Sequence, residues 1–337
     1  MLEKMNTKRW IAFGIAVLII GISALSTSLS SKINREERMK KLEDTIKSSV
    51  GNLSEDVLED GDAESRIAVI DVDGVIIDQP SMNTFAGGYN HQATLDALDD
   101  ILNDDTVKGV LLKVNSPGGG VYESAQLHKK LNALKEHKKK LFVSMGNMAA
   151  SGGYYISAPA EKIYAAPATI TGSIGVIMGG NNISGLLDKL GISDQTIKSA
   201  AHKDIGSTTR PMTDEERQIL QGVVDDMYGG FLKVVSEGRH IPIDQLRPLA
   251  DGSIFTGNQA KANGLIDEIG YEDDALNALK KAIKVDSPEV FEYNSSFDAS
   301  FLSGLFSQKA SEKEVAAKLL LESLSDGARP MYLYGGE

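Results

Sequence analysis

Ser151 is the residue whose surroundings best suit a nucleophile in this chain of 337 amino acids. It follows the apolar segment 141–143 and stands among small residues, in the run Gly-Asn-Met-Ala-Ala-Ser-Gly-Gly-Tyr-Tyr at 146–155. A serine at a strand-to-helix turn exposes its hydroxyl, and the first N–H groups of the following helix have no intrahelical acceptor. The pattern therefore favours a serine nucleophile, whereas tight helix packing through the small residues is the alternative interpretation.

A second glycine turn, at 118–120, follows the β-rich run 109–114 and precedes a helical pattern. In open α/β sheets the carboxyl ends of the strands share one edge, where ligands bind, so this turn is expected to meet Ser151. Acyl transfer needs about two fixed donors for the oxyanion, and losing one raises the barrier by about 3–4 kcal/mol. We predict that the backbone N–H groups of Gly119 and Gly152 form this oxyanion hole; an ordinary tight turn is the alternative for 118–120.

A serine hydroxyl also needs a general base. Several residues of this sequence are candidates for that role. No histidine lies between Ser151 and His202, so a Ser-His-Asp arrangement would recruit His202, His128 or a more distant residue. Lys198 and Lys203 are also available. A lysine acts as a base only when it is neutral, which requires desolvation or a nearby cation to lower its pKa from about 10.4.

Alternating strands and helices must hold these groups in place. Strands are predicted where β-rich apolar residues run together, at 67–72, 74–77, 109–114, 141–143, 162–165 and 172–178. Helices are predicted where apolar residues recur at helical spacing, at 95–102, 122–134 and 186–190. A capping-box pattern of Thr213 and Glu216 opens a longer helix that runs to about residue 237. This alternation predicts an α/β fold with a mainly parallel sheet and helices on its faces.

Composition excludes several classes of site and partner. The formal net charge of −12 argues against a nucleic-acid surface, because such proteins present a basic face to the phosphates. The absence of cysteine excludes disulfides, thiolate catalysis and cysteine zinc sites, and the five histidines show no metal-binding spacing. We therefore predict no metal, no cofactor and no nucleic-acid partner. An apolar content of 42% is ample for a buried core, so a globular enzyme is permitted.

The N-terminal part of the chain predicts a location. Residues 10–29 carry no charge, and at about 1.5 Å per residue such a span crosses a hydrocarbon layer of roughly 30 Å. Lys4, Lys8 and Arg9 precede it, and positive residues before an apolar span keep the N-terminus in the cytoplasm. We predict a single-pass anchor in the cell membrane, which includes a transmembrane helix, with the remainder of the chain extracytoplasmic. A cleavable signal peptide is the alternative.

These patterns divide the chain into segments. The predicted limits are a cytoplasmic N-terminus at 1–9, the anchor at 10–29, a polar tether at 30–65, a catalytic α/β domain at 66–286 and a C-terminal extension at 287–337.

Several motifs, in this order, resemble the signal peptide peptidase A family in its short, single-domain bacterial form. They lie at 116–120, 148–155, 171–176, 197–199 and 255–267. The resemblance covers roughly residues 67–283 together with the N-terminal span. It implies a crotonase- and Clp-protease-like fold of repeated ββα units, and a membrane-bound serine endopeptidase that uses a Ser-Lys dyad.

The same resemblance implies roles for individual residues. Ser151 would be the nucleophile, Lys203 the general base and Ser173 the serine that orients the lysine amine, with Lys198 as the second candidate for the base. It also implies a ring- or dome-shaped homo-oligomer whose active sites combine groups from neighbouring subunits. Ser151 and Lys203 therefore need not belong to the same chain.

The implied substrates are remnant signal peptides and other short apolar or unfolded polypeptides, cleaved through an acyl-enzyme. The anchor would hold the active sites above the bilayer where such peptides emerge. The apolar ending at 331–334 is hypothesised to occupy the substrate groove and restrain activity, with a simple packing anchor as the alternative. Two other classes compete: a crotonase-like acyl-CoA enzyme, which an extracytoplasmic location disfavours, and a non-catalytic oligomeric membrane scaffold, which the retained candidate residues disfavour.

Overall fold

The computed structural model describes residues 53–78, 89–295 and 330–335. The predicted cytoplasmic segment 1–9, the anchor 10–29, most of the tether and most of the C-terminal extension lie outside these residues. Within the described part of the chain, no helix has both the length and the apolar character needed to cross a membrane.

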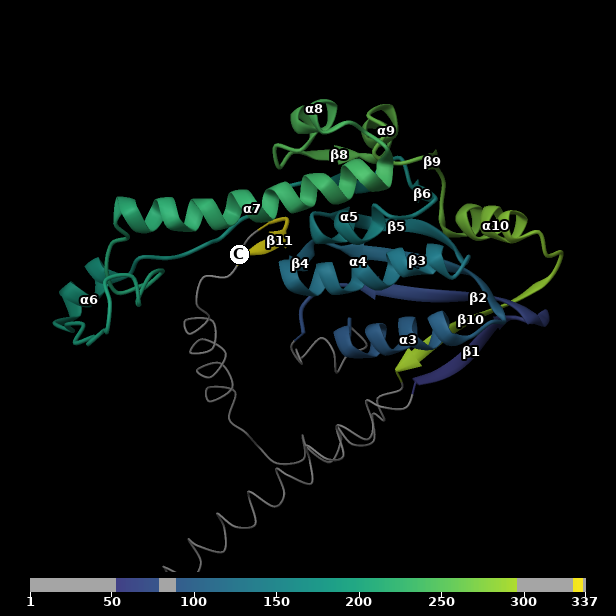
Figure 1. The fold of residues 1–337 in the computed structure, drawn as a ribbon, viewed down its shortest axis with the longest axis horizontal. Helices are drawn as coiled ribbons and strands as arrows, with labels where there is room; N and C mark the ends of the chain where they lie inside the picture. Colours follow the sequence, from purple (N-terminus) through teal and green to yellow (C-terminus); the bar gives the residue numbers. More distant parts are fainter. Residues whose placement is uncertain (1–52, 79–88, 296–329, 336–337) are drawn as a thin grey trace, which may run out of the picture. The chain divides into compact units, whose positions relative to one another are not determined.

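One mostly parallel sheet organises the described residues, with nine strands in that part of the chain (Figure 1). Its main path has the order β1-β10-β2-β3-β5-β6-β9, and β7 joins β8 to the sheet by pairing with β5. The bounds are β1 (Leu53–Glu59), β10 (Pro288–Ser295), β2 (Asp62–Asp73), β3 (Val107–Ser116), β5 (Lys140–Ala150), β6 (Lys162–Ala165), β9 (Glu268–Ile269), β7 (Ile170–Gly172) and β8 (Ile254–Thr256). All neighbours are parallel except β1 with β10 and β7 with β8.

Helices cover both faces of the central strands. The larger apolar cluster joins alternate residues of β2, β3 and β5 to three helices: α3 (His91–Asn103), α4 (Val121–Glu136) and α5 (Gly152–Ser157). The intervening residues Ile67, Leu111 and Phe142 pack instead against Ala275 and Leu279 of α10 (Glu272–Ile283). Burial on both faces explains why the central strands read as nearly continuous apolar runs.

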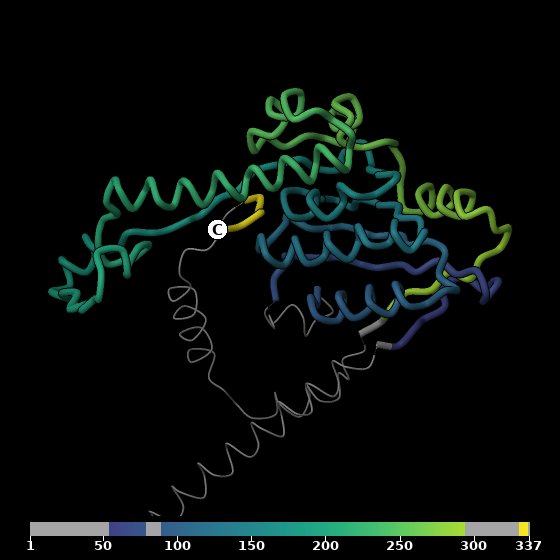
Figure 2. The backbone as a smooth tube through the Cα atoms, in the orientation of Figure 1, coloured from purple at the N-terminus to yellow at the C-terminus, as the bar shows by residue number. Residues whose placement is uncertain are grey.

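Residues 176–213, which we name the arm, leave the sheet and return through a long helix. The arm contains α6 (Ser184–Leu190) and leads into α7 (Asp214–Arg239), which opens with the predicted capping box of Thr213 and Glu216. Figure 2 shows the arm and the first half of α7 extending away from the layers formed by the sheet and its helices. The second half of α7 returns to the core, where Phe231 and Val235 are fully buried.

The remaining elements complete the domain. They are α8 (Ile243–Leu246), a short 3-10 helix (Arg247–Leu249), α9 (Gly257–Ala262), and a small second sheet of β4 (Gly118–Gly120) with β11 (Met331–Leu333).

Three features of the fold differ from the sequence expectations. The strand predicted at 74–77 is wrong, because only Ile76 pairs there, as an isolated bridge with Gly119. The strand predicted at 172–178 is wrong beyond Gly172, because Gly172 and Ser173 both have positive φ values, of 84° and 50°, which end an extended strand. The sheet also extends beyond the predicted domain limits 66–286. Strand β1 lies within the predicted tether and β10 within the predicted extension, and the two pair with each other.

Candidate active site

Ser151 occupies the turn between β5 and α5, with φ 52° and ψ −115°. A non-glycine residue in such a conformation costs about 1–3 kcal/mol and persists where its surroundings fix it. Here the Ser151 N–H donates to the carbonyl of Gly172 at 2.8 Å, and the residue is 1% exposed. This strained strand-to-helix turn is the geometry in which a serine serves as a nucleophile.

The predicted oxyanion donors come from two different elements and lie together. A methyl group placed on Gly152 would be 3.1 Å from the nitrogen of Gly119. Ile76 pairs with one edge of β4. Its N–H donates to the Gly118 carbonyl and its carbonyl accepts from the Gly120 N–H, both at 2.8 Å. These two bonds leave Gly119 free to hydrogen-bond on the opposite side of β4. The structure therefore brings Gly119, Gly152 and Ser151 to one place.

Strand β11, near the C-terminus, lies along this site. Tyr332 pairs antiparallel with Gly119, and its carbonyl oxygen would be 2.0 Å from a methyl group on Gly118. The same methyl group would be 2.6 Å from the nitrogen of Gly152. The carbonyl of Tyr332 thus lies beside both predicted oxyanion donors.

The other edge of β11 pairs with the start of the arm. Met331 exchanges two backbone hydrogen bonds with Ile177, at 2.8 and 3.1 Å, and the Tyr334 N–H donates to the carbonyl of Pro117 at 2.8 Å. An extended peptide segment therefore fits between β4 and the residues around Ile177. Nothing in the sequence pattern identified Ile76 or Ile177 as edges of this groove.

The side chain of Tyr332 fills an aromatic pocket at the groove. Its ring centroid lies 4.9 Å from that of Tyr155 and 4.6 Å from that of Phe231, and its hydroxyl donates to the carbonyl of Met227 at 3.2 Å. Tyr332 is 2% exposed, and this burial raises the pKa of its phenol. The pocket accepts a large apolar or aromatic side chain.

Ser173, the predicted base-orienting residue, lies next to the nucleophile turn. It is mostly buried, has φ 50°, and its N–H donates to the carbonyl of Ser253 at 2.8 Å. It directly follows Gly172, which accepts the hydrogen bond from Ser151. The two serines are therefore fixed relative to each other by the backbone.

Both candidate lysines belong to the arm, which extends away from the layers that contain β5 and α5 (Figure 1). Lys198 is paired with Asp204, with 2.7 Å between Nζ and the carboxylate oxygen, and it also donates to the carbonyl of Ala201 at 3.2 Å. Lys203 has no ion pair among the described residues. Within one chain, no hydrogen bond in the described part joins either lysine to Ser151.

The two histidines considered as bases have other surroundings. His202 lies 3.5 Å from Glu215, in the arm. His128 packs edge-on against Tyr155 with 5.2 Å between ring centroids, and burial lowers its pKa to about 4. Within one chain, neither ring has a hydrogen bond to Ser151 in the described residues.

The burial of His128 predicts a loss of stability in mild acid. Its pKa falls from 6.5 to about 4 on folding, so the unfolded chain binds more protons between these values and stability declines as the pH drops through that window. We expect the free energy of unfolding to fall by about 2 kcal/mol between pH 7 and 5, which lowers the unfolding midpoint by roughly 4–8 °C. Thermal unfolding of wild type and His128→Gln is measured at both pH values. The unfolding midpoint of the variant should fall less between pH 7 and 5, and equal decreases would contradict the lowered pKa of His128.

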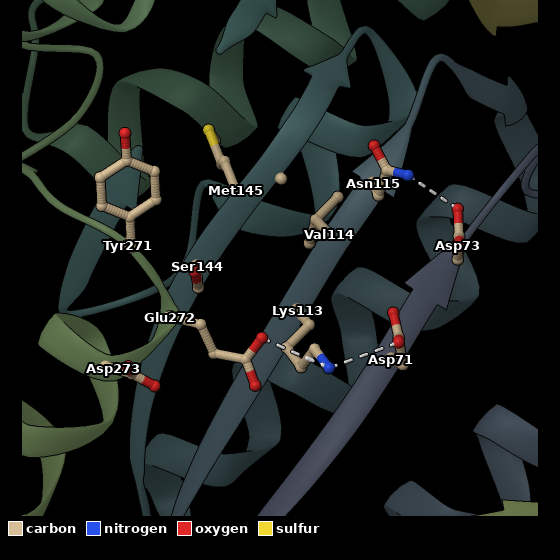
Figure 3. A pocket seen from close by; sticks show the side chains of 11 residues that line it. Asp71, Asp73, Lys113, Val114, Asn115, Ser144, Met145, Tyr271, Glu272 and Asp273 are labelled. Atoms are coloured by element: carbon tan, nitrogen blue, oxygen red, sulfur yellow. Dashed lines mark hydrogen bonds and ion pairs between the residues drawn. The ribbon is translucent and has the colours of Figure 1, made fainter. Parts of the chain in front are cut away.

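A separate polar pocket of about 340 Å³ lies on the α10 face of the sheet (Figure 3). Lys113 stands between two carboxylates, 3.4 Å from Glu272 and 3.7 Å from Asp71. Burial, followed by the neighbouring carboxylates, raises the pKa of Asp71 against the opposing effect of Lys113. No group of three or more histidine, aspartate or glutamate side chains in the described residues is arranged to hold a metal ion.

One residue connects this pocket to the nucleophile loop. The Asn115 amide donates to Asp73 at 2.9 Å, and its oxygen accepts from the Met148 N–H at 3.2 Å. Asn115 precedes the glycine turn, and Met148 lies three residues before Ser151. Asn115 therefore braces the two loops that carry the oxyanion donors, a role that the sequence analysis missed.

Comparison with known proteins identifies related sequences. Residues 133–286 match the model of peptidase family S49. Over 98% of this chain, the sequence is 41% identical to the full length of a candidate signal peptide peptidase SppA of Enterococcus faecium. It is 47% identical to a candidate protease of Methanocaldococcus jannaschii, over 59% of this chain and 64% of that protein. It is 37% identical to Protease 4 of Salmonella typhi, over 66% of this chain and 36% of that protein.

Proposed function

This chain belongs to peptidase family S49 and is a serine protease, and from that premise we propose that it degrades signal peptides through a Ser151–Lys203 dyad. The observation that carries the proposal is the seating of β11 on β4, with the Tyr332 carbonyl beside Gly119 and Gly152. A substrate peptide would take the same place as an added antiparallel strand. Its scissile carbonyl would then lie at Ser151, with an apolar side chain in the aromatic pocket.

The chemistry proposed is acyl transfer in two halves. The Ser151 hydroxyl attacks the carbonyl carbon as the neutral Lys203 amine takes its proton, and the N–H groups of Gly119 and Gly152 stabilise the oxyanion. The protonated lysine then gives this proton to the leaving amine, and an ester to Ser151 remains. A water molecule attacks the ester while Lys203 again accepts a proton, which returns to Ser151 as the acid product leaves. In this scheme Ser173 orients the lysine amine.

We propose that Lys203 acts on Ser151 of a neighbouring subunit in a homo-oligomeric ring or dome. The separation of the arm from the nucleophile turn supports this arrangement (Figure 1). So does the exposure of large apolar side chains on the arm, because contiguous apolar surface marks protein contacts. Those side chains are Leu186, Leu190, Ile192 and Ile197, with exposures of 55%, 63%, 53% and 99%.

The finer fold and the location are also proposals. The succession of β3, β4 and α4 is one strand-strand-helix unit, which supports the crotonase- and Clp-protease-like fold of repeated ββα units. The uncharged span at 10–29 supports a single-pass anchor in the cell membrane with the catalytic domain extracytoplasmic. The protease assignment replaces the acyl-CoA enzyme and scaffold alternatives.

Subunit mixing tests the proposed dyad. Ser151→Ala and Lys203→Ala subunits, each inactive alone, are unfolded together and reassembled in equal amounts, and hydrolysis of an apolar fluorogenic peptide is measured. If Ser151 and Lys203 come from adjacent subunits, about one quarter of the sites receives both intact residues. If each dyad forms within one chain, no site is intact and the mixture stays inactive. Reassembled wild type and each reassembled single variant are the controls.

The position of β11 predicts that the tail competes with substrate. Truncation after Asp326 removes β11, so we expect KM for the peptide to fall about tenfold while kcat is unchanged, since a tethered competitor acts at a high effective concentration. Tyr332→Ala should give part of this effect by emptying the aromatic pocket. Tyr271→Ala, which removes a tyrosine that is 67% exposed, is the control. Unchanged KM in both tail variants would leave β11 a packing element only.

A further inference from the structure

Arg210 sits between two carboxylates where the arm meets α7. Its Nε and Nη2 each lie 2.8 Å from an oxygen of Asp204, which makes a bidentate pair. Its Nη1 lies 2.8 Å from one oxygen of Glu216, and Nη2 contacts the other. One guanidinium therefore hydrogen-bonds to two carboxylates. Its planar, forked arrangement of N–H donors allows this, whereas a lysine amine has no such geometry.

Glu216 ties this cluster to the start of α7. It is 2% exposed, and its carboxylate also accepts from the Thr213 N–H at 2.9 Å in the capping box. The Arg210 guanidinium lowers the pKa of Glu216 to about 2 and holds the pKa of Asp204 well below its usual range. Both carboxylates are therefore ionised at neutral pH, so the cluster stays closed there.

Asp204 directly follows Lys203, the proposed base. The loop around these residues is otherwise held by short-range turns, in which the Lys203 N–H donates to the Ala200 carbonyl at 3.2 Å and the Ile205 N–H donates to the His202 carbonyl at 3.1 Å. The exposed contact of His202 with Glu215 of α7, at 3.5 Å, contributes little. Lys198 adds an ion pair to the same Asp204. Asp204 is therefore the point at which the base loop is fastened to a helix whose far end is buried in the core.

We propose that Arg210 is a positioning residue that fixes Lys203 relative to α7 by clamping Asp204 to Glu216. The inference rests on the proposed function, because it assumes that Lys203 is the general base. A base must lie within hydrogen-bond reach of its proton, and a displacement of about 1 Å costs on the order of 10²-fold in rate. The clamp makes the loop rigid enough to keep the Lys203 amine within hydrogen-bond distance of the serine hydroxyl. Arg210 thus acts through Lys203 and does not contact the substrate.

The test compares Arg210→Gln with Arg217→Gln, in the full-length protein in detergent. Arg217 follows Glu216, is exposed and is outside the clamp, so its variant controls for the lost charge. We expect kcat for an apolar fluorogenic peptide to fall about 30- to 100-fold in Arg210→Gln while KM stays within about twofold. Arg217→Gln should resemble wild type. Circular dichroism and size-exclusion chromatography establish that fold and assembly are kept.

Chemical rescue separates positioning from a general structural defect. In Arg210→Ala, millimolar guanidinium should recover a large part of kcat, whereas the same concentration of ammonium chloride should not, because only the planar ion bridges two carboxylates. Asp204→Asn weakens the clamp but changes the side chain less, and its kcat should fall in the same way. If both Arg210 variants fail to fold, Asp204→Asn is used for the test instead.

The outcomes separate this inference from the proposed function. If Lys203→Ala is inactive but Arg210→Gln and Asp204→Asn keep more than half of wild-type kcat, the clamp is overturned and the dyad stands. If the loss in the Arg210 variants comes with a raised KM or a broken assembly and guanidinium gives no rescue, the clamp is also overturned. If Lys203→Ala is active, the base assignment itself falls.

Discussion

We expect Ser151→Ala to abolish peptide hydrolysis, lowering kcat by about 10⁴-fold or more, and Lys203→Ala to lower it by about 10³–10⁴-fold. The first removes the atom that bonds to substrate, and the second removes the acceptor for its proton. Lys203→Arg should be as inactive as Lys203→Ala, because a guanidinium stays protonated and cannot serve as a base. Turnover of an apolar fluorogenic peptide by the full-length variants, at equal assembly, measures these effects.

Lys198→Ala is the matched control for the lysine assignment. The Lys198 amine is already engaged by the carboxylate of Asp204, with 2.7 Å between Nζ and the oxygen. We therefore expect this variant to keep at least about a tenth of wild-type kcat, since Arg210 still holds Asp204. An inactive Lys198→Ala beside an active Lys203→Ala would move the base to Lys198. Full activity of Ser151→Ala would overturn the nucleophile assignment.

Gly119→Ala is expected to lower kcat by about 10²–10³-fold, the usual loss when one oxyanion donor is displaced. The new methyl group would lie 2.0 Å from the carbonyl oxygen of Ile76 and 2.7 Å from its nitrogen. Both atoms belong to the backbone and cannot rotate away from the methyl group. Strand β4 must therefore move away from Ile76, which displaces the Gly119 N–H. Peptide hydrolysis and the thermal unfolding midpoint are measured together.

Gly179→Ala provides the control for this prediction, because a methyl group there meets no atom within 4 Å. It should keep both activity and stability. Gly152→Ala is a second route to the same test: its methyl group would lie 2.7 Å from the hydroxyl oxygen of the buried Ser124 and 3.1 Å from the nitrogen of Gly119. Folded protein with kcat within fivefold of wild type for both Gly119→Ala and Gly152→Ala would exclude this oxyanion hole.

Local patterns in the sequence determined most of what is local in the site. The small residues around Ser151, the glycine turn at 118–120 and the apolar run before each of them predicted two strand ends with exposed backbone donors. The capping box of Thr213 and Glu216 predicted where α7 begins. Such features are readable because each depends on a few neighbouring residues and on steric rules that hold in any fold.

Strands without an apolar pattern escaped the sequence analysis. Residues 54–59 of β1 are all exposed, so burial imposed no hydrophobic alternation on them. Its partner β10 comes more than two hundred residues later, and their pairing is a tertiary choice. The same is true of β11, whose three residues gain their strand conformation from β4 and from Ile177.

The sequence by itself predicted a serine at a strand-to-helix turn, a glycine turn as the second source of oxyanion donors, and an α/β sheet to bring them together. Only the tertiary structure decided which groups meet. It placed the C-terminal strand on β4 beside the predicted oxyanion donors, paired Lys198 with Asp204, and built residues 176–213 into an arm that extends away from the sheet layers. The physical reason is that conformation at a turn is set by nearby atoms, whereas contacts between distant segments depend on how every intervening element packs.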